Sequence, residues 1–272
     1  MAVIVFDADD TLWQNEWQYS RAQAEFFAYL YKVFGHYMPN LHYVKDVYFR
    51  LDGECFKTWG IKRGRVAHSM LLCYGEVSKW VAWRFGHTFR DSEIRKHHRV
   101  IKKIGDTPFD FSKLQWRRDA LPTLLELKEK GHILCLLSSY DEEWFAERVR
   151  YMDAGRFFDK RYIRSTNFKK TKQDFIAVSE WTPEMNETYA WYAVGNSASD
   201  IMPALEISEK WKGFYMPHGS TSKYLEHGKE PNNYPEPLCH FMPPSIDDPR
   251  VTTVHTLHEI LRVLHRNYGY CE

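Results

Sequence analysis

Three carboxylates lie within four positions, directly after an apolar run near the start of the chain. Residues 2–6 are apolar and rich in β-branched side chains, and Asp7, Asp9 and Asp10 follow them. Like charges this close repel one another, so the arrangement costs free energy unless a cation or a proton relieves it. In an extended stretch Asp7 and Asp9 project to the same side, about 6 to 7 Å apart. Two converging carboxyl groups suit a nucleophile paired with a general acid/base, beside a divalent cation.

A structural interpretation competes with the chemical one. An Asp-rich turn can follow a strand, and Asp10 with Thr11 can cap the next helix. This stretch alone leaves both interpretations open, so the rest of the chain has to decide between them.

The part of the chain after about residue 108 alternates strands with helices. An unbroken apolar run such as residues 2–6 is typical of a strand buried on both faces, and the alternation predicts a parallel sheet between helices. We therefore predict an α/β, Rossmann-like core. The predicted strands are 2–6, 132–138, 157–163, 189–195, 213–216 and 251–254; the predicted helices are 119–130, 141–151, 171–181, 198–208, 221–227 and 256–266, with 228–249 as a surface loop.

Residues 16–104 follow a helical pattern and contain no convincing strand. Apolar residues recur at helical spacing over 16–37, 42–58, 62–85 and 91–104. Because the strand at 2–6 needs the sheet formed later in the chain, the helices form an insertion. We predict a catalytic core made of 1–14 and 108–272, and a helical cap domain made of 15–107.

Composition restricts the function classes. The net charge of +1 over 272 residues argues against a general polyanion binder. The five cysteines are scattered, without the spacing of a zinc site, and are expected to be reduced thiols. No apolar run approaches the length of a membrane span and no targeting segment is recognisable, so we expect a cytoplasmic protein.

Residues with useful chemistry collect just after the predicted strands. Ligands of open parallel sheets sit outside the carboxyl ends of the strands. A nucleophilic carboxylate, hydroxyls, an ammonium group and a second metal-binding carboxylate together suit phosphoryl transfer at Mg²⁺. The candidates are Asp7, Asp9, Ser138, Ser139, Asn196 and Asp200, with Lys169, Lys170 and Lys172.

In this order the motifs resemble those of the haloacid dehalogenase superfamily, in its phosphatase branch with a helical cap. The first motif is Phe6-Asp7-Ala8-Asp9-Asp10-Thr11-Leu12, and the second ends at Ser138. The third is a lysine within 169–172, and the fourth is Gly195-Asn196-Ser197-Ala198-Ser199-Asp200. The sequence departs from many relatives at Asp10, where they have Gly, and at Asn196, where they have Asp.

The resemblance implies a role for each motif. Asp7 would form an aspartyl-phosphate, while Asp9 would protonate the leaving oxygen and then activate water. This requires Asp7 to be ionised, as its reference pKa of about 3.9 allows, and Asp9 to hold a proton. Because a halide leaves without a proton, the presence of Asp9 favours hydrolysis of a phosphate ester over removal of a halide.

The remaining site residues follow from the same resemblance. Mg²⁺ would be held by Asp7, the backbone carbonyl of Asp9 and Asp200. Ser138 and a lysine would position the phosphoryl oxygens, with Thr11, Ser139 and Asn196 as further substrate-binding residues. Counting back from Phe175 selects Lys170, although Lys169 and Lys172 stay open.

The leading hypothesis is a Mg²⁺-dependent phosphomonoester hydrolase acting on a small phosphorylated metabolite, such as a nucleotide or a sugar phosphate. One alternative is a phosphotransferase that uses the same aspartyl-phosphate; the other is a nucleic-acid- or partner-binding protein with a vestigial site. Residues 57–103 carry twelve Lys or Arg against three acids, which could steer anionic substrates or merely solvate helix faces. We expect neither a membrane nor nucleic acid as a partner, although the helical region is basic. The sequence names neither the substrate nor the oligomeric state.

Overall fold

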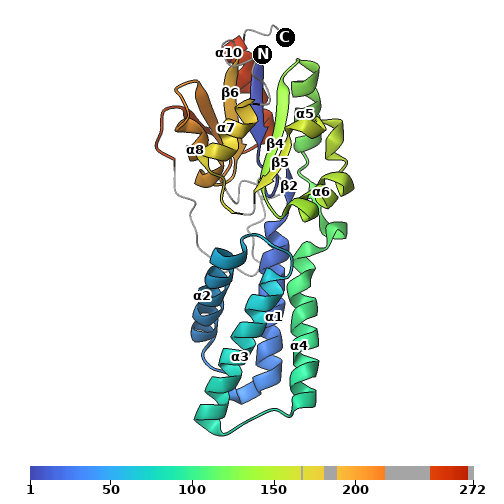
Figure 1. Cartoon of the computed structure of the whole chain (residues 1–272), viewed down its shortest axis with the longest axis vertical. Helices are drawn as coiled ribbons and strands as arrows, with labels where there is room; N and C mark the ends of the chain where they lie inside the picture. The colour runs from blue at the N-terminus through green and yellow to red at the C-terminus, as the bar shows by residue number, and fades with distance from the viewer. Residues whose placement is uncertain (167, 181–188, 218–245, 269–272) are drawn as a thin grey trace, which may run out of the picture. The chain divides into compact units, whose positions relative to one another are not determined.

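The computed structural model describes the whole chain except residues 167, 181–188, 218–245 and 269–272. The chain divides into two compact units, Met1–Gln14 with Leu114–Glu272, and Asn15–Lys113 (Figure 1). Residues 108–113, which the sequence analysis assigned to the core, belong to the second unit. There Phe109 packs edge-on against Tyr19 of the first helix, with ring centroids 6.1 Å apart.

The first unit is built on a six-stranded parallel sheet in the order β5-β4-β1-β6-β7-β8. β1 lies between β4 and β6, so the strand that carries the acidic turn is central, and the predicted α/β, Rossmann-like fold is confirmed. The strands are β1 (Ala2–Phe6), β4 (Ile133–Ser139), β5 (Ile163–Thr166), β6 (Ala190–Gly195), β7 (Trp211–Tyr215) and β8 (Val251–Thr253).

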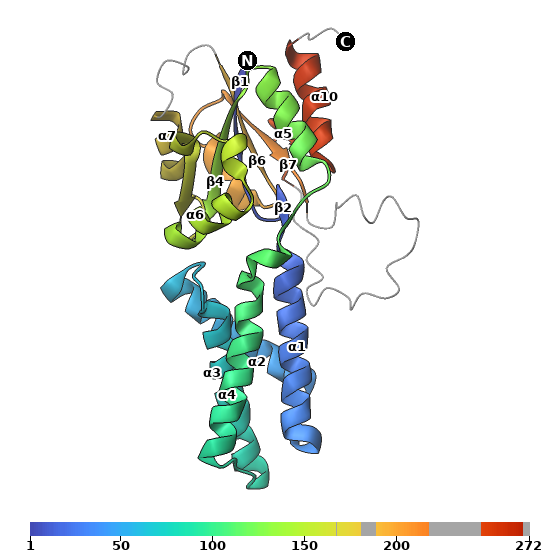
Figure 2. The same ribbon diagram turned by 90° about the vertical axis from the view of Figure 1, so that its right-hand side faces the viewer.

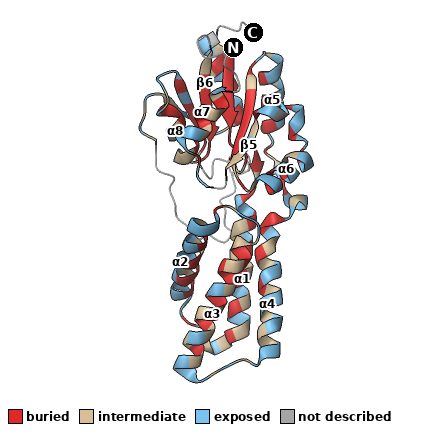
Figure 3. Ribbon diagram, in the orientation of Figure 1, coloured by how far each residue is buried: buried red, intermediate tan, exposed pale blue. Residues whose placement is uncertain are grey.

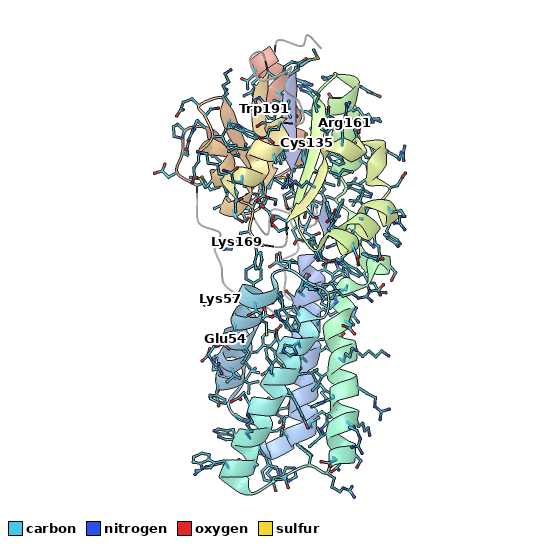
Figure 4. All side chains as sticks on the ribbon, viewed as in Figure 1. Glu54, Lys57, Cys135, Arg161, Lys169 and Trp191 are labelled. Atoms are coloured by element: carbon cyan, nitrogen blue, oxygen red, sulfur yellow. The ribbon has the colours of Figure 1, made fainter. Side chains whose placement is uncertain are left out.

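Helices cover both faces of this sheet. α7 and α8 bury apolar side chains against one face, in a cluster that includes Val5, Cys135 and Trp191 (Figure 4). α5 and α10 pack against each other on the other side (Figure 2). The helices of this unit are α5 (Ala120–Glu129), α6 (Glu142–Tyr151), α7 (Lys172–Glu180), α8 (Met202–Leu205) and α10 (Leu257–Tyr268).

The predicted strand at 157–163 is wrong. A 3₁₀ turn at Ala154–Arg156 precedes this segment, a second at Lys160–Tyr162 lies within it, and β5 begins only at Ile163. The carboxylate of Asp159 accepts a hydrogen bond from the backbone N–H of Arg161 and closes the second turn. The apolar side chains of Phe157 and Phe158 are buried in the core although the segment is not a strand. Phe158 lies edge-on to Phe6 of β1. The apolar pattern at 157–163 therefore reflects two buried aromatic side chains and not a strand.

Two further differences concern short segments. The helix predicted at 198–208 is shorter, a 3₁₀ turn at Ala198–Asp200 followed by α8. An antiparallel pair, β2 (Trp13–Gln14) with β3 (Gln115–Trp116), was not predicted because two residues are too few to show a period. The helix predicted at 221–227 and most of the loop predicted at 228–249 fall outside the described residues.

The second unit consists of four helices, as the sequence predicts. Their inner faces are buried and their outer faces exposed (Figure 3). α3 and α4 approach so closely at Gly105 that a Cβ there would lie 2.3 Å from the Cα of Ala67. The helices are α1 (Glu16–Phe34), α2 (Leu41–Trp59), α3 (Arg65–Phe85) and α4 (Asp91–Asp106).

The start of β1 is anchored by His132. Its Nδ1 accepts a hydrogen bond of 3.1 Å from the backbone N–H of Ala2. Burial, together with the nearby N-terminal ammonium group, lowers the pKa of His132 from 6.5 to about 4. The folded chain therefore keeps this imidazole neutral in a pH range where the unfolded chain protonates it.

We expect the free energy of unfolding to fall on acidification because of His132. The unfolded state binds the proton first, so the stabilisation is present above pH 6.5 and is lost as the pH drops towards 4, by up to about 3 kcal/mol. Urea denaturation of the wild type and of His132→Gln at pH 7 and pH 4.5 measures this. The glutamine variant should lose less stability between the two pH values, and an equal loss would contradict the assignment.

Candidate active site

The ends of β1, β4 and β6 bring the predicted chemistry to one edge of the sheet. Phe6 is in register with Leu136 on one side and with Val194 on the other. Asp7 comes directly after Phe6, and its backbone N–H donates to the carbonyl of Val194 at 2.8 Å. Ser138, which is buried, and Ser139, which is half-buried, end β4, and Asn196 follows β6. Parallel pairing therefore places all four residues at the carboxyl edge.

Lys170 joins the two carboxylates that the sequence assigned to metal binding. Its Nζ lies 2.5 Å from Oδ1 of Asp7 and 2.5 Å from Oδ1 of Asp200, and all three side chains are buried. Lys169 (Figure 4) and Lys172 are exposed. Of the three lysines that the sequence left open, Lys170 is the one whose ammonium group lies at the site.

Asp200 is fixed from two sides. Its Oδ2 accepts hydrogen bonds from the backbone N–H and the hydroxyl of Ser197, at 2.8 and 2.6 Å, while Oδ1 faces Lys170. Gly195 allows this close packing, because a Cβ there would lie 2.1 Å from the Cβ of Asp200. The turn after β6 therefore holds this carboxylate in one orientation.

Thr11 and Asn196 orient the nucleophile candidate. The hydroxyl of Thr11 lies 3.1 Å from Oδ2 of Asp7 and 3.4 Å from Oδ1 of Asn196, within hydrogen-bond reach of both. With Lys170 on Oδ1 and Thr11 on Oδ2, both oxygens of Asp7 are held. The sequence analysis assigned Thr11 and Asn196 to the substrate, and the structure shows Thr11 in contact with Asp7 and within reach of Asn196.

Burial shifts the pKa values of both Asp7 and Lys170. The pKa of Asp7 is raised to about 7, because burial outweighs the opposing ammonium group of Lys170 and the charges of Asp200 and Asp9 add to the effect of burial. Burial alone would lower the pKa of Lys170, but Asp200 and Asp7 outweigh it and raise the pKa. One ammonium group thus faces two buried carboxylates.

Asp9 lies against a buried arginine that the sequence analysis did not identify. Nη1 of Arg148 donates to Oδ2 of Asp9 at 3.0 Å, and Nη2 lies 2.9 Å from Oδ1. The indole Nε1 of Trp13 donates to Oδ1 at 2.7 Å, and the guanidinium lies 4.4 Å from the ring centroid of Tyr140. These donors suit a carboxylate that accepts hydrogen bonds, whereas the resemblance requires Asp9 to hold a proton.

A sequence signal for Arg148 does exist. It shares the buried face of α6 with Trp144 and Phe145, at spacings of four and three residues. A charged side chain on an apolar helix face is rarely buried without a partner. The pattern therefore indicates a buried ion pair, although it does not identify Asp9 as the partner.

Asp10 belongs to the turn. Its φ of 59° is left-handed, and its backbone N–H donates to the carbonyl of Trp13 at 2.6 Å. Asp is one of the few residues besides Gly that tolerate this conformation. The structural interpretation of the acidic stretch therefore applies to Asp10.

The donor set fits a hard divalent cation. Asp7 and Asp200 converge on one point, occupied by the ammonium group of Lys170. Within the described residues no three His, Cys, Asp or Glu side chains form a group that could hold a metal. Mg²⁺ needs no such cage, since one or two carboxylates complemented by waters and substrate phosphate oxygens suffice.

Comparisons with known proteins rest on the fold. No protein-family model matches the sequence, and no curated protein matches it either.

Among the described residues, no helix has both the length and the apolar character that crossing a bilayer requires.

Several solved structures cover nearly the whole chain. A haloacid dehalogenase-like family hydrolase from Xanthomonas campestris has a TM-score of 0.63 at 18% identity, covering 99% of this chain and 94% of its own. The 2-haloacid dehalogenase from Pseudomonas syringae pv. Tomato DC3000 has a TM-score of 0.54 at 16% identity, covering 98% and 99%. The HAD-hydrolase YfnB from Bacillus subtilis, in a structure bound to magnesium, has a TM-score of 0.53 at 16% identity, covering 97% and 98%. The chain therefore has the fold of the haloacid dehalogenase-like hydrolases.

Proposed function

We propose that the chain is a Mg²⁺-dependent phosphomonoester hydrolase that acts on a small phosphorylated metabolite through an aspartyl-phosphate on Asp7. The observation that carries the proposal is the buried cluster of Asp7, Lys170 and Asp200 at the carboxyl edge of the sheet. A nucleophilic carboxylate, a phosphate-binding cation and a metal-binding carboxylate lie within contact of one another there.

Asp7 is the nucleophile. One of its oxygens attacks phosphorus, the phosphorus–oxygen bond to the leaving group breaks, and the carboxylate becomes an acyl phosphate. Thr11 and Lys170 hold the two oxygens and so fix the direction of attack. Correct orientation of a nucleophile is a large part of catalysis in such sites.

Asp9 is the residue that donates and accepts protons in the two steps. Water attacks the phosphorus of the aspartyl-phosphate and gives its proton to Asp9, which releases Asp7 and inorganic phosphate. In the first step Asp9 enters protonated and gives this proton to the leaving oxygen, and the carboxylate so formed accepts hydrogen bonds from Arg148 and Trp13. Arg148 is thus a positioning residue, since it acts through Asp9.

Asp7, Asp200 and the backbone carbonyl of Asp9 would hold the metal ion, in line with the magnesium in the YfnB structure. When bound, Mg²⁺ neutralises charge on the phosphoryl oxygens. Ser138 at the end of β4 and Lys170 bind the same oxygens, and Ser139 adds a further hydroxyl.

The helical unit Asn15–Lys113 is proposed as the cap that selects the substrate. The proposed location is the cytoplasm. The buried free thiols of Cys55, Cys73 and Cys135 suit a reducing compartment.

Arg148→Gln should lower kcat by about 10²-fold with little change in KM, because Asp9 loses the contacts that place it. Steady-state kinetics measure both constants. Arg150→Gln is the matched control, since Arg150 lies on the same helix but is exposed. A wild-type kcat in Arg148→Gln would show that Arg148 has no part in catalysis.

A screen of phosphorylated metabolites with and without Mg²⁺ tests the function itself. Inorganic phosphate should appear only with Mg²⁺, and with water as the acceptor. A phosphorylated acceptor forming faster than free phosphate would identify a phosphotransferase. Halide release from 2-haloacids, without hydrolysis of any phosphoester, would overturn the proposal.

A further inference from the structure

The outer face of α4 is a continuous basic surface. At 100° per residue its basic side chains fall within one arc of about 160° of the helix. All of them are exposed. We define the α4 basic face as Arg95, Lys96, His98, Arg99, Lys102 and Lys103.

The opposite side of α4 is fully engaged in the four-helix unit. Ile101 is completely buried, and Gly105 lies against Ala67 of α3. The acids of the helix are at its ends, and Glu93 pairs with Arg90 in the first turn. Between Arg95 and Lys103 the α4 basic face therefore carries no acidic residue, and Ile101 and Gly105 of the same helix pack inside the unit.

Some exposed cations elsewhere in this unit pair with acids. Arg21 pairs with Glu25, Arg50 with Glu54 and Lys79 with Glu76. Within the described part of the chain, no residue of the α4 basic face forms an ion pair with an acid.

The uncompensated charges also oppose one another. Arg95 and Arg99, and Arg99 and Lys103, are four residues apart, a spacing at which like charges destabilise a helix. An arrangement that costs stability and serves no internal contact indicates an external anionic partner.

A shallow, open pocket lies on this face. Ser92, Arg95, His98 and Arg99 line it, so a hydroxyl and three basic side chains surround one hollow. Hydroxyl and guanidinium groups are typical donors to phosphate oxygens. These four side chains offer donors to phosphate oxygens at one place on α4.

We propose that the α4 basic face binds the phosphate backbone of a nucleic-acid duplex, independently of the proposed hydrolase activity. From Arg95 to Lys103 the helix rises about 12 Å. A duplex presents one charge per about 1.7 Å of its axis, so this length of duplex carries about seven phosphates on its two strands. The α4 basic face sets five Lys and Arg side chains along the same length.

A membrane surface fits less well. Helices that bind lipid bury an apolar face between the head groups, and the apolar residues of α4 are already used inside the unit.

The near-zero net charge of the chain argued against a general polyanion binder in the sequence analysis. The structure shows instead that the cations gather on one face, and local density decides binding to phosphates.

Fluorescence anisotropy with a labelled, mixed-sequence DNA duplex tests the proposal on the full chain. The wild type should bind, and its affinity should fall by about 10³-fold between 50 and 200 mM salt. Arg95→Gln/Arg99→Gln/Lys102→Gln should reduce the slope of log affinity against log salt by about 3. Arg21→Gln/Arg50→Gln/Lys79→Gln is the matched control, because it removes the same charge from the same unit at paired positions.

Each outcome has a defined meaning. Loss of binding in the α4 variant alone, with circular dichroism unchanged in both variants, supports the proposal. Equal losses in the two variants would reduce the effect to net charge and overturn it. Absence of duplex binding by the wild type, or binding only to vesicles of anionic phospholipid, would overturn it as well.

Discussion

Asp7→Asn is expected to abolish turnover, with kcat at least about 10⁴-fold below the wild type. An amide cannot attack phosphorus, and no other carboxylate takes its position, because Asp200 is held by Ser197 and Lys170. The fold should persist, since the variant replaces one of two buried carboxylates that share a single ammonium group. Phosphate release and thermal unfolding, measured on the same preparation, separate catalysis from stability.

Asp10→Asn is the matched control for this prediction. It removes a carboxylate from the same acidic stretch, and Asn tolerates the left-handed conformation of that position. Activity should stay within a few-fold of the wild type. If Asp10→Asn lost as much activity as Asp7→Asn, the two carboxylates would not have the separate roles that the structure gives them.

The meeting of Asp7 with Asp200 could be predicted because parallel strands end at a common edge. Once residues 2–6 and 189–195 are recognised as parallel strands of one sheet, the residues after them are expected at the same edge, and the structure pairs the two strands directly. The choice among three lysines could not be predicted in the same way. Counting back from Phe175 selects Lys170 by resemblance alone, whereas the structure distinguishes it physically, by its burial against two carboxylates.

The partner of Arg148 could not be predicted from the sequence for a different reason. It pairs with Asp9, which lies 139 residues away in the chain. Periodicity shows that its face of α6 is buried but gives no partner, because pairing depends on how the helix sits beside the turn after β1. The wrong strand at 157–163 has a similar cause, since a buried aromatic pair and a strand give the same local pattern.

Lys170→Met should destabilise the chain by about 3–5 kcal/mol when no divalent cation is present. The variant leaves two buried carboxylates facing each other without their shared cation, and loss of one partner of a buried ion pair has this typical cost. Lys169→Met is the control, because that side chain is exposed and its removal should change stability by less than about 0.5 kcal/mol. Urea denaturation measures both variants.

Added Mg²⁺ should restore part of the stability of Lys170→Met, and more than it adds to the wild type. A cation that binds only the folded state stabilises it by mass action, and the pair of carboxylates lacks its internal cation only in this variant. A variant as stable as the wild type, or one that does not respond to Mg²⁺, would argue against a metal site between Asp7 and Asp200. Recovery of stability without recovery of phosphate release would separate two contributions of Lys170, neutralising the buried carboxylates and binding the phosphoryl group.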